Sequence, residues 1–115
     1  MIFRNRRHSA TAIAAFKDVA DALEAVRRDA EADAEATERA TASRRQWDIA
    51  IRGEALGDLS RQDVLAAQSQ LLQNEALQVQ TRAARLADAA EALVALGGAI
   101  DDAAPPACGV AASSP

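Results

Sequence analysis

The chain has 115 residues and a formal net charge of −4, and half of its residues are hydrophobic. Alanine supplies 31 of these, whereas Val, Ile, Leu and Phe together number 23 and aromatic residues make up only 3%. Because alanine buries little area and the chain is short, this composition excludes a compact globule with a thick core. Good helix formers dominate and β-branched residues are scarce, so the composition favours long helices that pack on a partner surface.

Several classes of protein are also excluded. An acidic chain with few aromatic residues is a poor nucleic-acid binder, so no nucleic-acid partner is expected. No stretch reaches the ~18 consecutive apolar residues of a membrane-spanning helix. The single cysteine, Cys108, cannot form an internal disulfide. The basic lead-in at residues 1–9 does not make a secretory signal, so the chain expressed alone is expected in the cytoplasm.

The chain divides into a basic lead-in and a helical hairpin that is followed by a tail. The predicted hairpin covers residues 10–98, with a helix at about 10–51, a tip at 52–61 and a second helix at about 62–97. Gly97 and Gly98 are expected to end the second helix, and the Pro-containing residues 99–115 are expected to be disordered. A short Gly-containing connector predicts that the helices run antiparallel, so the expected fold is an all-α two-helix coiled-coil hairpin.

The first helix starts amphipathic and then loses its apolar face. Its early apolar residues recur at spacings of three and four, namely Ile13, Phe16, Val19, Leu23, Val26 and Ala30. Between residues 29 and 42 the stripe thins to alanine, and the carboxylates of residues 29–38 are interpreted as a solvated face. Trp47 then reopens the apolar face, with Ala40, Ser43 and Ala50 at heptad spacing around it.

The second helix carries a strict heptad repeat. Large apolar residues occupy every seventh position, at Leu65, Leu72, Val79, Leu86 and Leu93, and the positions between them are small, at Ser69, Ala76, Ala83, Ala90 and Gly97. This repeat predicts the helix seam, a left-handed supercoil against another helix. A second stripe runs through Val64, Ala67, Leu71, Leu77 and Ala84, so this helix is expected to touch more than one neighbour.

The sequence contains no catalytic constellation. The only histidine, His8, lies among arginines in the lead-in, and no Cys/His cluster has metal-ligand spacing. Gly53 and Gly57 do not belong to a phosphate-binding loop, because the GxxxxGK[ST] pattern is missing. No enzyme activity, cofactor or metal is therefore expected.

The connector has more signals than a simple turn requires. Gly57 suits a chain reversal, because glycine alone takes positive φ without strain. Ser60 followed by Asp63 fits a capping box at the start of the second helix, where Asp63 also favours the helix dipole.

Four separated motifs resemble TolC-type outer membrane efflux channels, the outer membrane factors of RND tripartite pumps. Gly57 is followed after five residues by Asp63-Val64-Leu65 and Ala67-Gln68, similar to the periplasmic tip of that family. Residues 14–23 (AAFKDVADAL) resemble the family's AFxEVADAL, residues 78–88 (QVQTRAARLAD) resemble its returning helix, and residues 95–98 (ALGG) match its closing motif.

The resemblance implies a passive duct for the export of small molecules. It implies a homotrimer that is anchored in the outer membrane and builds an α-helical tunnel across the periplasm. It also implies a periplasmic adaptor that docks on the tip, at Gly57, Asp58, Leu59 and Ser60. Asp63 would be a gating residue at that tip. The chain would supply only the last helical hairpin of a longer, truncated channel.

Some positions depart from the family pattern. Gly53-Glu54 stands where the family has Arg-Tyr, and Ala66 replaces the Asp that follows Val-Leu. The alternative interpretation is a free-standing coiled-coil interaction module, such as a cytoplasmic adaptor or a secretion chaperone.

Overall fold

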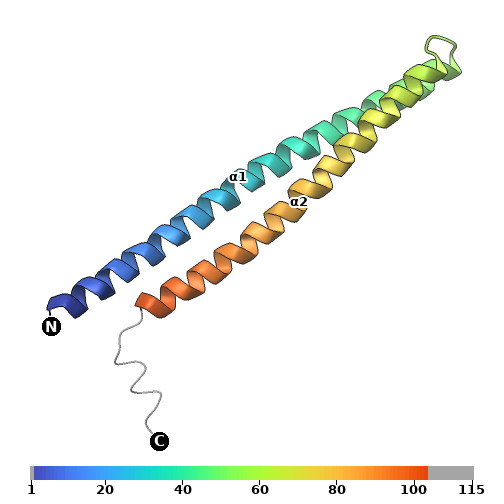
Figure 1. Cartoon of the computed structure of the whole chain (residues 1–115). Coiled ribbons are helices and arrows are strands. Elements are labelled where there is room, and N and C mark those ends of the chain that lie inside the picture. Colours follow the sequence, from blue (N-terminus) through green and yellow to red (C-terminus); the bar gives the residue numbers. More distant parts are fainter. Residues whose placement is uncertain (1, 104–115) are drawn as a thin grey trace, which may run out of the picture. The chain divides into compact units, whose positions relative to one another are not determined.

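The protein is built from two long helices joined by a short turn. In the computed structural model, which describes residues 2–103 and the side chains of residues 9–103, α1 spans Ile2–Ala55 and α2 spans Arg61–Ala103. Residues 56–60 connect them (Figure 1). The prediction of an all-α antiparallel hairpin is confirmed. The first helix begins earlier than predicted and runs four residues further, so the tip is shorter than the predicted 52–61.

The chain separates into two compact units. Residues 27–87 form the first, which contains the turn and is called the turn unit below. Of the described residues, 2–26 and 88–103 form the second, called the end unit. Each helix therefore contributes one segment to each unit.

Polar side chains fix the register of the turn unit. Ser43 is bonded to Asn74, and Thr37 Oγ1 accepts a hydrogen bond of 3.1 Å from Gln78 Nε2. Further from the turn, Asp33 Oδ2 pairs with Arg85 Nη1 at 2.9 Å. Partner numbers rise along α2 as they fall along α1, which is the signature of an antiparallel pair.

The core of the turn unit is thin because small residues line it. The residues buried between its helices are Ala36, Ala40, Ser43 and Ala50 from α1, and Val64 and Leu71 from α2. Trp47 is half-buried among them, which confirms the apolar face predicted around it. Alternation at spacings of three and four residues along α1 is the pattern of a coiled-coil seam. Small side chains let two helix axes approach closely but exclude little apolar surface from water.

The heptad stripe of α2 does not form this seam. Leu65, Leu72, Val79 and Leu86 are 49, 58, 67 and 73% exposed, and Leu93 in the end unit is 70% exposed. The stripe predicted as the helix seam therefore does not pack on α1, and its supercoil against another helix stays a prediction. Val64 and Leu71 of the second stripe are each only 5% exposed and lie against α1, whereas Leu77 is 36% exposed and Ala84 is also exposed. The expectation that α2 touches more than one neighbour stays a prediction, since the described residues supply only its contact with α1.

The end unit contains an open apolar groove. The groove has a volume of about 350 Å³ and lies between Val19, Leu23 and Val26 of α1 and Ala89, Ala92, Leu93 and Leu96 of α2. Near its end Ala99 is buried, whereas Ile13, Phe16 and Ile100 remain exposed. The predicted apolar stripe at the start of the first helix is thus only partly used within the chain.

The second helix ends later than predicted. Gly97 and Gly98 are helical, and α2 continues to Ala103, so the prediction that these glycines end the helix and that the tail begins at residue 99 is wrong. Glycine within a helix costs only about 1 kcal/mol relative to alanine, and the flanking residues are good helix formers. The described part of α2 reaches Ala103, two residues before Pro105. The remainder of the predicted tail lies outside the described residues.

Candidate functional site

The chain leaves α1 through a Schellman motif centred on Gly57. The Gly57 N–H donates to the Glu54 carbonyl at 3.0 Å, and the Asp58 N–H donates to the Gly53 carbonyl at 2.8 Å. Gly57 has φ +82°, the left-handed conformation that this motif requires. A side chain at this position would be strained even though the surrounding space is open. The role predicted for Gly57 in the chain reversal is confirmed.

Leu59 folds back over Gly53. A Cβ atom added at Gly53 would lie 2.6 Å from Leu59 Cδ1 and 2.8 Å from its Cγ, closer than atoms can approach. The Leu59 N–H also donates to the Gly53 carbonyl at 3.1 Å. Gly53 therefore leaves the space in which the tip leucine packs. Sequence reasoning assigned no such role to Gly53, although a glycine in the last turn of a helix is an available signal.

The second helix begins with the predicted capping box. The Asp63 N–H donates to Ser60 Oγ at 3.1 Å, and both the Ser60 N–H and its hydroxyl donate to Asp63 Oδ2 at 2.9 Å. These bonds satisfy amide groups that lack partners within the helix. The Ser60 backbone N–H, and then its hydroxyl, hold the pKa of Asp63 below its ordinary value of 3.8. Asp63 thus has a structural role at the tip, as part of the capping box. A gating role for Asp63 stays a prediction.

The lowered pKa of Asp63 predicts a pH dependence of stability. A carboxyl with a folded-state pKa below its unfolded value stabilises the fold above the unfolded pKa, and this contribution is lost as the pH falls through the folded value. The melting temperature of Asp63→Asn should therefore lie below that of the parent at neutral pH, and the gap should narrow below pH 3.8. Circular dichroism melts across this range would measure the gap.

Asp58→Asn is the control for that measurement. It removes the same charge from the turn while leaving the Ser60–Asp63 pair in place. The assigned role of the Asp63 charge would be contradicted if the difference in melting temperature between Asp63→Asn and the parent stayed constant from neutral to acid pH.

The tip presents an exposed surface with an apolar centre. Gly57, Asp58 and Ser60 are exposed, Leu59 is 37% exposed, and Leu56 is 77% exposed. Sequence reasoning missed Leu56, which is the most exposed large side chain of the turn. Arg61 Nη1 lies 3.6 Å from Glu54 Oε1 and ties the start of α2 to the end of α1. The tip therefore holds a fixed shape without the Arg-Tyr pair of the resembling family.

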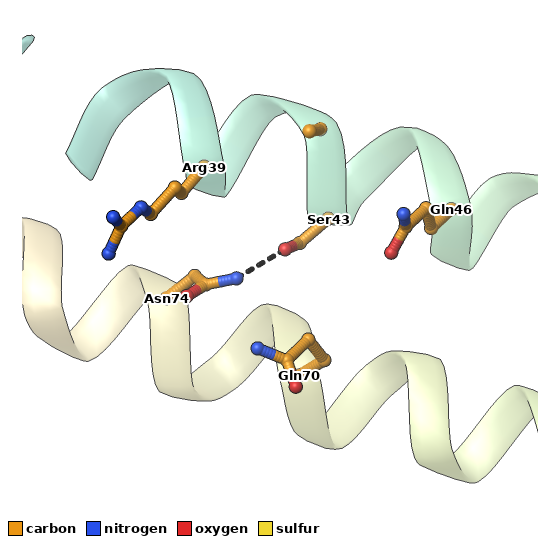
Figure 2. Close-up of a pocket in the computed structure, with 6 residues that line it drawn as sticks. Arg39, Ser43, Gln46, Gln70 and Asn74 are labelled. Carbon is orange, nitrogen blue, oxygen red and sulfur yellow. Dashed lines mark hydrogen bonds between the residues drawn. The ribbon is translucent and has the colours of Figure 1, made fainter. Parts of the chain in front are cut away.

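A polar groove opens on the turn unit between Ser43 and Asn74. It has a volume of about 550 Å³ and is lined by Arg39, Ala42, Ser43, Gln46, Gln70 and Asn74. Figure 2 shows Asn74 reaching across to Ser43, with Arg39 on one side of the pair and Gln46 and Gln70 on the other. Nearby, Arg44 Nη2 and Glu75 Oε1 form an ion pair of 2.6 Å. The groove is open, and the Ser43–Asn74 hydrogen bond joins two of the side chains that line it.

Asp33 departs from the predicted solvated face. Its side chain is only 13% exposed, and it pairs with Arg85 at 2.9 Å and with Arg82 at 3.7 Å. The interpretation of all carboxylates of residues 29–38 as a solvated face is wrong at this position. Asp33 lies at a heptad position of the buried face of α1, where an acid can remain only because two arginines of α2 reach it. Its place in that heptad was the available signal.

The described part of the chain contains no group of three or more His, Cys, Asp or Glu side chains that could hold a metal ion. Among these same residues no helix is apolar over the length needed to cross a bilayer. The side chains of His8 and Cys108 lie outside the described residues.

Comparison of the chain with protein-family models, with curated proteins and with solved structures finds no match. The tip and the exposed face of α2 are therefore the features on which a functional interpretation depends.

Proposed function

We propose that the chain is a wall hairpin of a TolC-type outer membrane efflux channel. In such a channel the hairpins of three subunits line a tunnel across the periplasm, and their tips meet a periplasmic adaptor. The motifs at residues 14–23, 57–68, 78–88 and 95–98 support this proposal by their order and spacing. The chain would contribute positioning and docking surfaces and no chemical step.

The observation that carries the proposal is the pair of apolar faces on α2. A wall helix needs a neighbour on each side, so it must be apolar on two faces. Leu71 is 5% exposed against α1, whereas the adjacent Leu72 is 58% exposed. A helix that belonged to an isolated hairpin would need only the first of these faces.

The tip suits a docking role because it is fixed before any partner binds. The Schellman motif, the Leu59–Gly53 contact and the capping box hold residues 56–60 in one conformation. A preorganised loop loses less conformational entropy on binding than a flexible one. We assign the adaptor contact to Gly57, Asp58, Leu59 and Ser60, with Leu56 added as the apolar anchor.

One observation favours the alternative of a free-standing interaction module. Within the turn unit, the described residues of α1 that face water are largely charged, including Arg27, Glu31, Glu38 and Arg45. A wall built of identical hairpins would need an apolar outer face on α1 as well. A channel would therefore require the neighbour of α2 to come from a different hairpin of a longer protein.

A graft tests the channel proposal. Residues 11–98 would replace the last hairpin of a complete TolC-type channel, and cells lacking their own channel would be tested for resistance to a drug that the pump exports. The proposal predicts that resistance survives the graft. It also predicts that Leu56→Asp in the graft lowers resistance while channel abundance in the outer membrane stays unchanged.

Leu56→Met is the matched control, because it keeps an apolar side chain at the tip and should preserve resistance. A graft that fails to assemble into the outer membrane would overturn the wall assignment. A graft that exports equally well with Leu56→Asp would overturn the docking assignment alone.

A further inference from the structure

We infer that the turn unit is closed by charge at the end away from its turn, and that this end opens on its own while the helices near the turn stay packed. The far end consists of residues 27–35 of α1 and 79–87 of α2. The ion pairs of Asp33 with Arg82 and Arg85 are called the clasp below. The inference concerns the chain itself and does not rest on the proposed channel.

Apolar packing stops before the far end. The buried residues of the turn unit lie between Ala36 and Leu71. None of the described residues of the far end is buried, and its large apolar side chains, Val79 and Leu86, are 67 and 73% exposed. Separating the two helices here would therefore bring little additional apolar surface into water. Segments with few buried apolar contacts open locally at low cost in free energy.

Charge joins the two helices where apolar packing is missing. Asp33 Oδ2 accepts a hydrogen bond of 2.9 Å from Arg85 Nη1, and Arg82 Nε lies 3.7 Å from Oδ1. The Oδ1 atom is buried and accepts no hydrogen bond, so it depends on the nearby arginine for compensation. Asp29, one turn earlier on α1, is also half-buried. The far end thus places acids of α1 on a seam to which α2 contributes arginines.

The clasp can be released without unfolding either helix. The Arg82 and Arg85 side chains are 60 and 51% exposed, so each can turn to water when Asp33 no longer holds it. Separation would also return water to the Asp33 carboxylate, which offsets part of the lost attraction. Alanine, arginine, glutamate and glutamine are good helix formers and make up most of the far end, so both segments should stay helical when apart.

The helices nearer the turn are held in a different way. Uncharged side chains cross the seam there, with Gln78 Nε2 donating to Thr37 Oγ1 at 3.1 Å and Asn74 donating to Ser43. Leu71 is buried against α1 in the same region. None of these contacts depends on a charge, so opening is expected to stop at the Thr37–Gln78 bond.

Distances between pairs of spin labels on the full chain test this inference. In a Cys108→Ser background, labels at Ala32→Cys and Ala84→Cys would report on the far end, and labels at Ala42→Cys and Gln73→Cys on the part nearer the turn. All four labelled positions are exposed, so the labels do not enter the seam. Pulsed electron paramagnetic resonance should give a narrow distance distribution for both pairs in the parent.

Asp33→Asn should broaden the far-end distribution and shift it to longer distances, while the distribution nearer the turn stays unchanged. Glu31→Gln is the matched control, because it removes the same charge two residues away. Glu31 pairs with Arg27 at 2.7 Å within α1 and does not cross the seam. This control should therefore leave both distributions as they are in the parent. Circular dichroism would verify that both variants remain helical.

Salt provides a second test that does not depend on the folding of a variant. Raising the ionic strength from about 0.01 M to about 1 M shortens the Debye length from ~30 Å to ~3 Å. The far-end distribution of the parent should broaden, but less than in Asp33→Asn, because the Asp33 side chain is only 13% exposed and is partly shielded from ions. Asp33→Asn has no clasp to screen and should respond little to salt.

Three results would overturn the inference. A far-end distribution that stays narrow both in Asp33→Asn and at high salt would mean that charge does not close this end. Equal broadening of the two label pairs would mean that the turn unit opens as a whole. Broadening in Glu31→Gln as large as in Asp33→Asn would assign the effect to net charge and not to the clasp.

Discussion

Leu71→Ala is expected to lower the free energy of unfolding by about 2–5 kcal/mol, the range observed when a buried leucine is truncated. Leu71 is 5% exposed and is one of only two large aliphatic residues buried in the described turn unit. Because the remaining buried positions are alanines and a serine, no neighbouring side chain is long enough to fill the space left behind. Chemical denaturation of the full chain, followed by circular dichroism, would measure the loss.

Leu72→Ala is the natural comparison. The two leucines are adjacent in sequence, but Leu72 is 58% exposed and lies on the exposed heptad stripe of α2. At a concentration where the chain is monomeric, Leu72→Ala should change the free energy of unfolding far less than Leu71→Ala. Equal losses for the two variants would mean that the buried and exposed faces of α2 are wrongly assigned.

The sequence alone does not show which of these leucines packs against α1, for a definite reason. A heptad repeat records that a helix face packs on another helix, but it does not record whether that helix belongs to the same chain. The exposed heptad stripe of α2 has the more regular repeat. The buried face passes through Asn74, Gln78 and Thr81, and these polar residues interrupt its apolar pattern. Asn74 and Gln78 donate across to α1, and these bonds become visible only when α1 is in place, whereas the Thr81 hydroxyl donates to the Gln78 carbonyl within α2.

The turn was predicted more fully than the seam because its signals are local. Gly57 needs positive φ, and Ser60 and Asp63 bond within three residues of each other, so the sequence already contains both partners of each interaction. The Leu59–Gly53 contact spans six residues and depends on the exact path of the turn, which no pattern specifies. Long-range pairs such as Asp33 with Arg85 could not be predicted without the register of the hairpin.

The end of α2 was also hard to predict from the sequence. A glycine pair is a frequent stop signal, yet Gly97 and Gly98 remain helical, with open space beside both. Neighbouring alanines and the burial of Ala99 outweigh the modest cost of two glycines. A signal based on propensity alone is therefore weaker than one with a bonded partner, such as the capping box.

Ala36→Leu is expected to destabilise the turn unit by about 1–3 kcal/mol, because inserting a large side chain into a packed site forces its surroundings apart. Ala36 is 2% exposed, the lowest value among the buried residues, so a leucine there has no route to solvent. The added volume would push α1 away from α2 beside Thr37, whose hydroxyl accepts the 3.1 Å hydrogen bond from Gln78. The substitution would therefore disturb both the packing of the seam and the register of the two helices.

Ala34→Leu is the control for this substitution. It adds the same side chain two residues away, at an exposed position of the same helix, and it should leave the free energy of unfolding nearly unchanged. Denaturation curves of the two variants would separate the effect of burial from that of helix propensity, since leucine and alanine are both good helix formers. If Ala36→Leu were as stable as Ala34→Leu, the small residues of α1 could not be the reason that the two helices approach closely. The thin seam of the turn unit would then be held by its polar pairs rather than by close packing.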